Sequence, residues 1–367
     1  MSAENSTRLP ATMPAVVCHG PEDYRLEEMP VPRPGPGEVL VRVHSVGICA
    51  SDIKCYQGAA LFWGDEHRSG YCQAPVIAGH EFVGEIVAMG EGAAAVDGSA
   101  LELGQVAVAE QIVPCWRCRF CRTGRYWMCQ QHDIYGFRTR TPGGMAGYLL
   151  YPADSINHVV PEDVPRDHAV FIEPLACSIH AVQRAELQLD DVVVIAGSGP
   201  LGLGMIAAAH RQGPRLVVAL DLNDGRLEVA QQCGADLTFN PSKVDAVEEV
   251  LRLTEGYGCD AYIEATGHPA AVEQGLRMIR KLGTFVEFSV LREKVTVDWT
   301  VIGDTKELNL HGSHLGPYCY PIAIDMLRQG QLPMDAILTH DLPLASFQEG
   351  FDRMASGKDS IKVTLRP

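Results

Sequence analysis

One stretch of the chain, residues 191–202, constrains the fold more than any other. A run of β-branched residues at 192–195 leads directly into Ala196-Gly197-Ser198-Gly199-Pro200-Leu201-Gly202. Such a run is typical of a buried parallel strand. The three glycines have the spacing of a dinucleotide-binding turn, which needs a tight turn, a close approach of the pyrophosphate and close packing of helix on strand. We therefore predict that Gly197, Gly199 and Gly202, with Pro200 and Leu201 at the helix N-terminus, bind the phosphates of a dinucleotide.

An acidic residue after the next predicted strand strengthens this interpretation. Residues 215–220 are mostly apolar and end in Asp221, about 20 residues beyond the turn, where an acid that binds the adenosine ribose is expected. A carboxylate accepts hydrogen bonds from the ribose hydroxyls of NAD and repels the 2′-phosphate of NADP. Arg226 is close enough to contact the cofactor, although a position in the first turn of a solvent-facing helix is the alternative. We predict NAD as the cofactor.

The order of patterns along the chain predicts two domains. From residue 191 to about 310, helical segments alternate with strands near 192–196, 216–221, 237–239, 259–264, 284–288 and 308–311. This alternation indicates an α/β fold with a doubly wound parallel sheet. Apolar and polar residues alternate over 14–46, as in antiparallel strands, and a last strand at 360–365 is expected to return to that part. We predict a β-rich domain of residues 1–173 and 312–367, which includes a helix near 321–328, and a nucleotide-binding domain of residues 174–311. Residues 56–75 show no period and are expected to form a loop.

Composition narrows the class of partner. The chain has 367 residues, 46% of them hydrophobic, and a formal net charge of −16. An acidic protein is a poor ligand for nucleic acid or for an anionic membrane, which are bound through lysine and arginine. We find no apolar run long enough to span a bilayer and no apolar signal segment near the N-terminus. A small-molecule substrate and a cytoplasmic location are therefore expected.

Four of the twelve cysteines form the sharpest local motif. Cys115, Cys118, Cys121 and Cys129 lie within fifteen positions, and four thiolates at this spacing can close a tetrahedral zinc site with no open position, as in structural zinc sites. We predict a structural zinc lobe over residues 112–132. One alternative is a cluster of unmetallated, oxidisable thiols. Another is a zinc ribbon that binds nucleic acid, which the nearby arginines favour and the acidity of the whole chain opposes.

A second set of potential ligands is dispersed along the chain. It comprises Cys49, His80, Glu81 and Glu173. One thiolate, one imidazole and one carboxylate would make a three-ligand zinc site with a free fourth position, as expected of a catalytic metal. Spacing alone does not establish this site, and a single histidine is more often a packed or exposed residue than a ligand.

Several motifs together resemble one enzyme family. Gly79-His80-Glu81-x2-Gly84, the four-cysteine lobe, Glu173-Pro174-Leu175 and the glycine turn occur in the order found in the zinc-dependent medium-chain dehydrogenase/reductase family. The resemblance implies a GroES-like catalytic domain, a Rossmann domain, one catalytic and one structural zinc per chain, and a homodimer or homotetramer. Cys49-x-Ser51-Asp52 and Glu173 are similar to the polyol (sorbitol-like) branch, and the insertion at 56–75 is similar to that of bacterial erythritol and threitol dehydrogenases.

The resemblance also implies a reaction. A secondary hydroxyl of a short polyol would be oxidised to a ketose, with hydride transfer to NAD held in the other domain. Ser51 is the candidate first proton acceptor, and Asp52 is expected to orient a zinc ligand. Either Glu81 or Glu173 could be the inner carboxylate. Phe62 and Trp63 are expected to cover a small substrate pocket, with ordinary packing as their alternative.

Other activities fit the same resemblance. The alternatives in the family are L-threonine 3-dehydrogenase, 2,3-butanediol dehydrogenase and sorbitol dehydrogenase. An alternative from another class is a non-catalytic zinc-binding scaffold or interaction protein. Two zinc ions per chain would indicate the enzyme, whereas one would indicate the scaffold.

Overall fold

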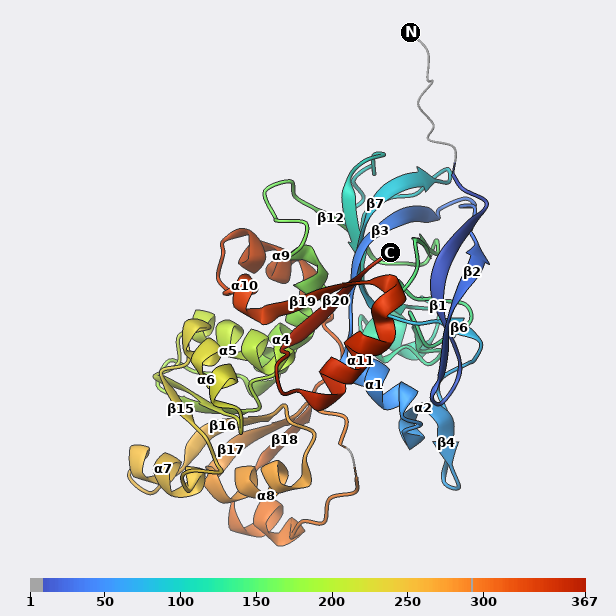
Figure 1. Cartoon of the computed structure of the whole chain (residues 1–367). Coiled ribbons are helices and arrows are strands. Elements are labelled where there is room, and N and C mark those ends of the chain that lie inside the picture. Colours follow the sequence, from blue (N-terminus) through green and yellow to red (C-terminus); the bar gives the residue numbers. More distant parts are fainter. Residues whose placement is uncertain (1–8, 292) are drawn as a thin grey trace. The chain divides into compact units, whose positions relative to one another are not determined.

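A mixed sheet forms the centre of the first of two units in the computed structural model, which describes residues 9–291 and 293–367. This unit contains the chain up to Glu173 together with Leu338–Pro367, and the second contains Pro174–Ile337. The strand order of the sheet is β12-β8-β7-β3-β20-β19, and β11 also pairs with β3 (Figure 1). The strands are β3 (Val39–Gly47), β7 (Glu81–Met89), β8 (Val106–Ala109), β11 (Tyr148–Tyr151), β12 (Asn157–Val160), β19 (Leu338–Pro343) and β20 (Lys362–Arg366).

The central strands of this sheet are apolar because they are covered on both faces. Val39, Val41 and Val46 of β3 are completely buried, and so is Leu40, which points into a second apolar cluster. A smaller sheet has the order β2-β1-β6, built from β1 (Thr12–Gly20), β2 (Asp23–Pro30) and β6 (Val76–Ile77). The alternating pattern of residues 14–46 thus predicted antiparallel strands correctly.

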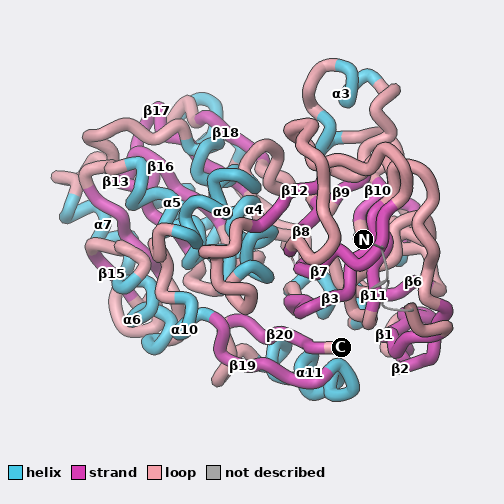
Figure 2. Tube along the Cα trace, turned by 90° about the horizontal axis from the view of Figure 1, so that it is seen from above, coloured by secondary structure: helices cyan, strands magenta, loops and turns pink. Residues whose placement is uncertain are grey.

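Short elements complete the first unit. They are α1 (Ala50–Tyr56), α2 (Ala60–Trp63), the hairpin β4 (Gly64–Asp65) and β5 (Arg68–Ser69), the pair β9 (Ile112–Val113) and β10 (Asp133–Ile134), α3 (Arg119–Arg122), and the 3-10 turns η1 (Tyr126–Met128), η2 (Ala169–Phe171) and η4 (Leu344–Ser346). Figure 2 shows how loops predominate around α3. The expectation of a plain loop at 56–75 is wrong in part, because α2 and the hairpin occupy its middle. Both elements are too short to produce a recognisable period in the sequence.

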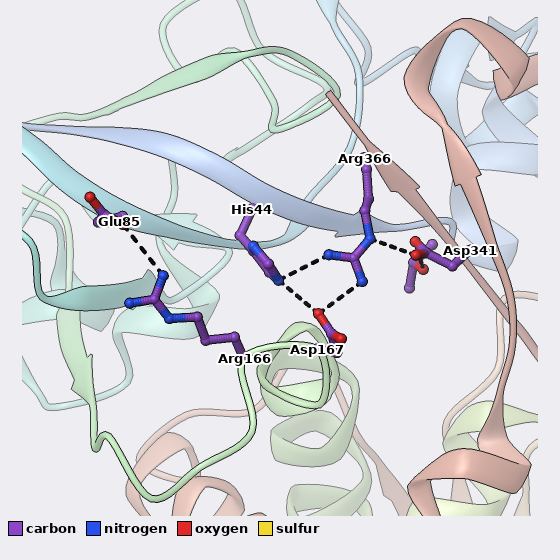
Figure 3. Close-up of polar contacts among 7 residues, drawn as sticks. His44, Glu85, Arg166, Asp167, Asp341 and Arg366 are labelled. Atoms are coloured by element: carbon purple, nitrogen blue, oxygen red, sulfur yellow. Dashed lines mark hydrogen bonds and ion pairs between the residues drawn. The ribbon is translucent and has the colours of Figure 1, made fainter.

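The C-terminal segment returns to the first unit as expected. Helix α11 (Phe347–Ser356) packs Phe351 against Tyr56 of α1, with ring centroids 5.4 Å apart. Arg366, at the end of β20, donates to Asp167 over 2.8 Å and to Asp341 over 2.5 Å, and contacts the His44 imidazole (Figure 3). The C-terminal segment is therefore held by the aromatic packing of α11 and by the main-chain pairing and ion pairs of β20.

The second unit contains the predicted doubly wound parallel sheet. Its order is β15-β14-β13-β16-β17-β18, in which the strand that precedes the glycine turn lies third from one edge, as in dinucleotide-binding folds. The strands are β13 (Val192–Ala196), β14 (Leu216–Leu220), β15 (Leu237–Phe239), β16 (Cys259–Glu264), β17 (Ile279–Glu287) and β18 (Asn309–Gly312). The helical segments are α4 (Ile172–Ala185), which begins at the boundary between the units, α5 (Pro200–Gln212), α6 (Asp224–Gln232), α7 (Ala246–Leu253), α8 (Pro269–Met278), the π-helical turn η3 (Val301–Thr305), α9 (Tyr320–Arg328) and α10 (Met334–Ile337).

One boundary differs from the expectation. Residues 312–337, assigned from the sequence to the β-rich domain, fall within the second unit. Cys319 Sγ lies 3.5 Å from the side-chain oxygen of Gln183, and Asp325 of α9 pairs with Arg211 of α5 over 3.3 Å. These contacts attach α9 to helices of the second unit.

In the described part of the chain no helix combines the length and apolar character that crossing a membrane requires.

Candidate active site

Three potential metal ligands from separate segments meet in the first unit. Cys49 is the N-cap of α1, two residues beyond the end of β3, and His80 immediately precedes Glu81, the first residue of β7. Gly47 pairs with Glu81 across these antiparallel strands. One ligand atom each from Cys49, His80 and Glu81 lies within 4.8 Å of the other two. A sulfur, an imidazole nitrogen and a carboxylate oxygen so close together fit a zinc ion.

Asp52 holds two of these groups in place. Its side chain is 1% exposed, and its Oδ2 accepts a hydrogen bond from the Cys49 backbone N–H over 2.8 Å. Its Oδ1 lies 3.4 Å from Nδ1 of His80. Burial lowers the pKa of His80, but the negative charges of Asp52 and Cys49 raise it by more. Nδ1 faces the carboxylate, so Nε2 is the nitrogen available to a metal.

Ser51 lies beside the same imidazole. Its hydroxyl oxygen is 3.3 Å from Nε2 of His80. A hydroxyl next to the ligand atom of a metal site is within reach of a substrate hydroxyl that occupies the free coordination position. This position agrees with the role expected for Ser51 as the first proton acceptor, which stays a prediction.

The two candidate carboxylates occupy different positions. Among the described residues, Glu81 and not Glu173 falls in the group with Cys49 and His80. Glu173 is buried at the start of α4, and its charge helps to raise the pKa of Lys362. Glu173 is therefore near the set without being part of it. The arrangement favours Glu81 as the inner carboxylate in this conformation.

Lys362 is a member of the site that the sequence analysis missed. Its ammonium forms an ion pair with Glu81, with both side chains almost completely buried, and donates to the Ile48 carbonyl over 3.0 Å. Burial lowers the pKa of Lys362, but Glu81, Cys49 and Glu173 raise it by more, so the net shift is upward. The only signal in the sequence is a lysine that alternates with the apolar residues Ile361, Val363 and Leu365 near the C-terminus.

Lys54 is the first basic side chain after Ser51 in the sequence. It lies half-buried on α1, three residues after Ser51. Because a protonated ammonium has no lone pair with which to accept a proton, we expect Lys54→Ala to leave kcat within about tenfold, or ~1.4 kcal/mol. Steady-state kinetics beside Ser51→Ala, which should lose more than tenfold, will check this. A loss of several orders of magnitude in Lys54→Ala would assign proton exit to Lys54.

The two predicted substrate residues, Phe62 and Trp63, make different contacts in the first unit. Phe62 is 2% exposed and stacks on Phe137 with centroids 5.1 Å apart, and Phe137 in turn lies 5.3 Å from the His80 ring. Trp63 is half-buried and donates from Nε1 to the Cys55 carbonyl over 2.7 Å. Phe62 therefore supports the site from behind Phe137, and Trp63 fixes α2 to α1. Contact of either ring with substrate stays a prediction.

The four-cysteine motif also converges. One sulfur from each of Cys115, Cys118, Cys121 and Cys129 lies within 4.8 Å of the others. Backbone N–H groups of Cys121 and Gln130 lower the pKa of Cys118 to about 6, whereas burial raises the pKa of Cys121 to about 12. A metal ion must therefore displace the Cys121 proton on binding. The set has the composition and closeness of a closed structural zinc site.

The glycine turn fits a bound pyrophosphate. Gly197 has φ of 100°, and a side chain at Gly202 would collide with the Gly197 carbonyl. In contrast, a Cβ added at Gly199, the N-cap of α5, would meet nothing within 4 Å. The Ser198 hydroxyl is buried without a hydrogen-bond partner in the described structure. This open space and unpaired hydroxyl at a helix N-terminus suit a phosphate.

Asp221 is oriented toward the same turn. Its Oδ2 accepts from the Ser198 backbone N–H over 2.7 Å, and its Oδ1 accepts from that of Asn223 over 2.8 Å. Arg226 is half-buried in the first turn of α6, where the Asn223 side chain caps its backbone N–H.

We expect Asp221→Ser to raise kcat/KM with NADP relative to NAD at least tenfold, because the repulsion of the 2′-phosphate is removed. Parallel kinetics with both cofactors will measure this ratio. Asp224→Ser, at an exposed acid three residues later at the start of α6, should leave the ratio unchanged. Equal use of NAD and NADP by the unmodified protein would contradict the role of Asp221.

Two family models match the chain. Residues 35–162 match the alcohol dehydrogenase GroES-like domain, and residues 200–329 match the zinc-binding dehydrogenase domain. The first match covers Cys49, His80, Glu81 and the four-cysteine motif. The second begins within the glycine turn and includes Asp221.

Full-length relatives give the same result. The chain is 56% identical to the erythritol/L-threitol dehydrogenase of Mycolicibacterium smegmatis, over 99% of each chain. It is 34% identical to the L-threonine 3-dehydrogenase of Pyrococcus horikoshii, over 98% of this chain and 99% of the relative.

Solved structures share the whole architecture. A zinc-binding dehydrogenase from Sinorhizobium meliloti bound to NADP has a TM-score of 0.87 and 27% identity, covering 98% of this chain and 100% of the other. A short chain alcohol dehydrogenase from E. coli CFT073 complexed with NADH has a TM-score of 0.84 and 26% identity, with the same coverage. The expected fold and resemblance are confirmed, and none of these matches supports the alternative of a non-catalytic scaffold.

Proposed function

Because the chain belongs to the zinc-dependent alcohol dehydrogenase family, we propose that it oxidises a secondary hydroxyl of a four-carbon polyol such as erythritol or L-threitol, with NAD as hydride acceptor. The clustered Cys49, His80 and Glu81 carry the proposal, because they supply a thiolate, an imidazole and a carboxylate to one metal. The high identity to a full-length relative of that specificity supports the choice of polyol.

The roles of the residues follow from their chemistry. When bound, zinc polarises the substrate hydroxyl and lowers its pKa, and NAD accepts the hydride. Ser51 accepts the hydroxyl proton, and its 3.3 Å contact with His80 supports this role. Asp52 fixes the imidazole. The glycine turn binds the pyrophosphate and Asp221 binds the adenosine ribose.

The experiment is a substrate panel combined with metal analysis. Purified protein is assayed with erythritol, L-threitol, D-threitol, sorbitol, L-threonine and 2,3-butanediol, each with NAD and with NADP, by the absorbance of the reduced nicotinamide. We expect the highest kcat/KM for a tetritol with NAD and two zinc ions per chain. A higher kcat/KM for L-threonine would favour the second candidate, an L-threonine 3-dehydrogenase, which the 34% relative supports. One zinc and no turnover would reject both.

Assembly and location belong to the same proposal. Strand β18 forms an edge of the six-stranded sheet, and Leu310 on it is 45% exposed. An exposed edge strand that carries an exposed leucine is suited to pairing with a second copy, so we propose a homodimer or homotetramer. None of the twelve cysteines, all of which lie in the described residues, forms a disulfide, as expected in a reducing cytoplasm. Molecular mass in solution by light scattering tests the assembly.

A further inference from the structure

A buried ion pair adjoins the proposed catalytic metal set. The Lys362 and Glu81 side chains are 2% and 1% exposed and pair directly. Burying two charges costs several kcal/mol per ion unless they are paired and hydrogen-bonded, and Lys362 also donates to the Ile48 carbonyl. A buried salt bridge of this kind adds little net free energy to folding, but it fixes the position of both groups. The group that it positions is the carboxylate beside Cys49 and His80.

The strand register explains how residues so far apart in sequence meet. Gly47 of β3 pairs with Glu81 of β7 on one side and with Thr364 of β20 on the other. Lys362, two residues before Thr364, has its side chain on the same face as that of Thr364, because side chains alternate along a strand. A Cβ at Gly47 would collide with Glu81 Oε2 and would lie 2.9 Å from Cε of Lys362. The ion pair therefore occupies the space that a side chain at position 47 would fill.

Other acidic groups surround the ion pair between Lys362 and Glu81. Cys49 and Glu173 also act on the Lys362 ammonium, and Asp52 is buried next to His80. A bound divalent ion would face four acidic groups, namely the half-buried Cys49 thiolate and the buried carboxylates of Asp52, Glu81 and Glu173. Lys362 is the positive side chain at Glu81, and it competes with the metal for that carboxylate. A carboxylate shared with an ammonium donates less negative charge to a metal than a free one.

We propose that Lys362 and Gly47 are positioning residues that hold Glu81 partly away from the catalytic metal, so that the metal keeps its power to polarise the substrate. This inference rests on the proposed function. Its consequence is that removal of Lys362 releases Glu81 to bind the metal fully. The metal is then held more tightly but polarises the substrate hydroxyl less.

The test replaces Lys362 in the full-length, metal-loaded protein. Lys362→Met should retain two metals per chain, slow the chelator-driven loss of the catalytic metal at least threefold, and lower kcat at least tenfold with KM within about threefold. With cobalt in place of zinc, its visible absorption should change relative to the unmodified protein, because the coordination changes. Lys362→Arg, which keeps the charge, should restore the unmodified absorption and most of kcat.

Matched controls separate positioning from general damage. Lys306 likewise donates to backbone carbonyls, those of Leu276 and Ile279 over 2.7 and 2.6 Å, but lies in the other unit. Lys306→Met should lower thermal stability and leave the cobalt absorption unchanged. Gly47→Ala should reproduce the spectral change of Lys362→Met, whereas Gly84→Ala, which crowds the Arg42 carbonyl on the same strand pair, should not.

The outcomes distinguish this inference from the proposed function. If Lys362→Met and Gly47→Ala both keep the cobalt absorption and the chelation rate of the unmodified protein, the inference is overturned, even if both variants lose activity. Absence of a second metal or of polyol oxidation in the unmodified protein would instead reject the proposed function. If Lys362→Met does not fold, the spectrum of Gly47→Ala alone decides the matter.

Discussion

Cys49→Ala is expected to lower polyol oxidation by NAD at least 1000-fold, about 4 kcal/mol in the activation barrier. Cys49 supplies the sulfur of the three-ligand set, and its backbone N–H anchors Asp52, which in turn orients His80. Removal of the thiolate leaves an imidazole and a carboxylate, too few protein ligands to hold a catalytic zinc. The loss should appear in kcat/KM for every substrate, because the metal acts on the reacting hydroxyl.

Metal content and cofactor binding identify the cause of that loss. Zinc should fall from two ions to one per chain, because the four-cysteine site is separate. NADH affinity, measured by fluorescence titration, should stay within about threefold, because the glycine turn and Asp221 belong to the other unit. Cys319→Ser, at a buried cysteine outside both metal sets, is the matched control. A Cys49→Ala protein that keeps both metals and substantial turnover would remove Cys49 from the site.

The sequence predicted those parts of the fold that depend on interactions between residues close together in the chain. The buried strand at 192–196 and the following glycine turn appear as expected, because a branched apolar run and the glycine positions leave few alternatives. The four cysteines converge for a similar reason, since they lie close together in sequence. Cys49 and His80 required the family resemblance, because thirty intervening residues allow many arrangements.

Features that depend on long-range packing could not be read in this way. The pair of Lys362 with Glu81 depends on the register of three strands from opposite ends of the chain. The apolar pattern of α9 does not indicate which unit the helix packs against, so the pattern alone did not assign it. The choice between Glu81 and Glu173 depends on distances of a few ångströms, to which the motif around each residue is not sensitive.

Cys121→Ser is expected to have the largest effect on stability among single changes in the four-cysteine lobe. Cys121 is 7% exposed, and a hydroxyl does not replace a thiolate as a ligand, so the structural zinc should be lost. Because structural zinc contributes directly to folding, we expect a loss of about 3 kcal/mol. In a large domain this lowers Tm by roughly 6–12 °C, measurable by calorimetry.

Trypsin provides a local readout of the same change. The lobe carries four exposed arginines, at positions 117, 119, 122 and 125, which become cleavable once the surrounding backbone opens. Cleavage in Cys121→Ser should therefore begin within residues 115–130 and should leave the parallel-sheet unit intact. Cys233→Ser is the control, because burial raises the pKa of Cys233 to about 12 and that thiol lies outside both metal sets. If Cys121→Ser keeps two zinc ions and an unchanged cleavage pattern, the four sulfurs do not hold a metal. Loss of one zinc ion together with early cleavage in the lobe is expected only if they do.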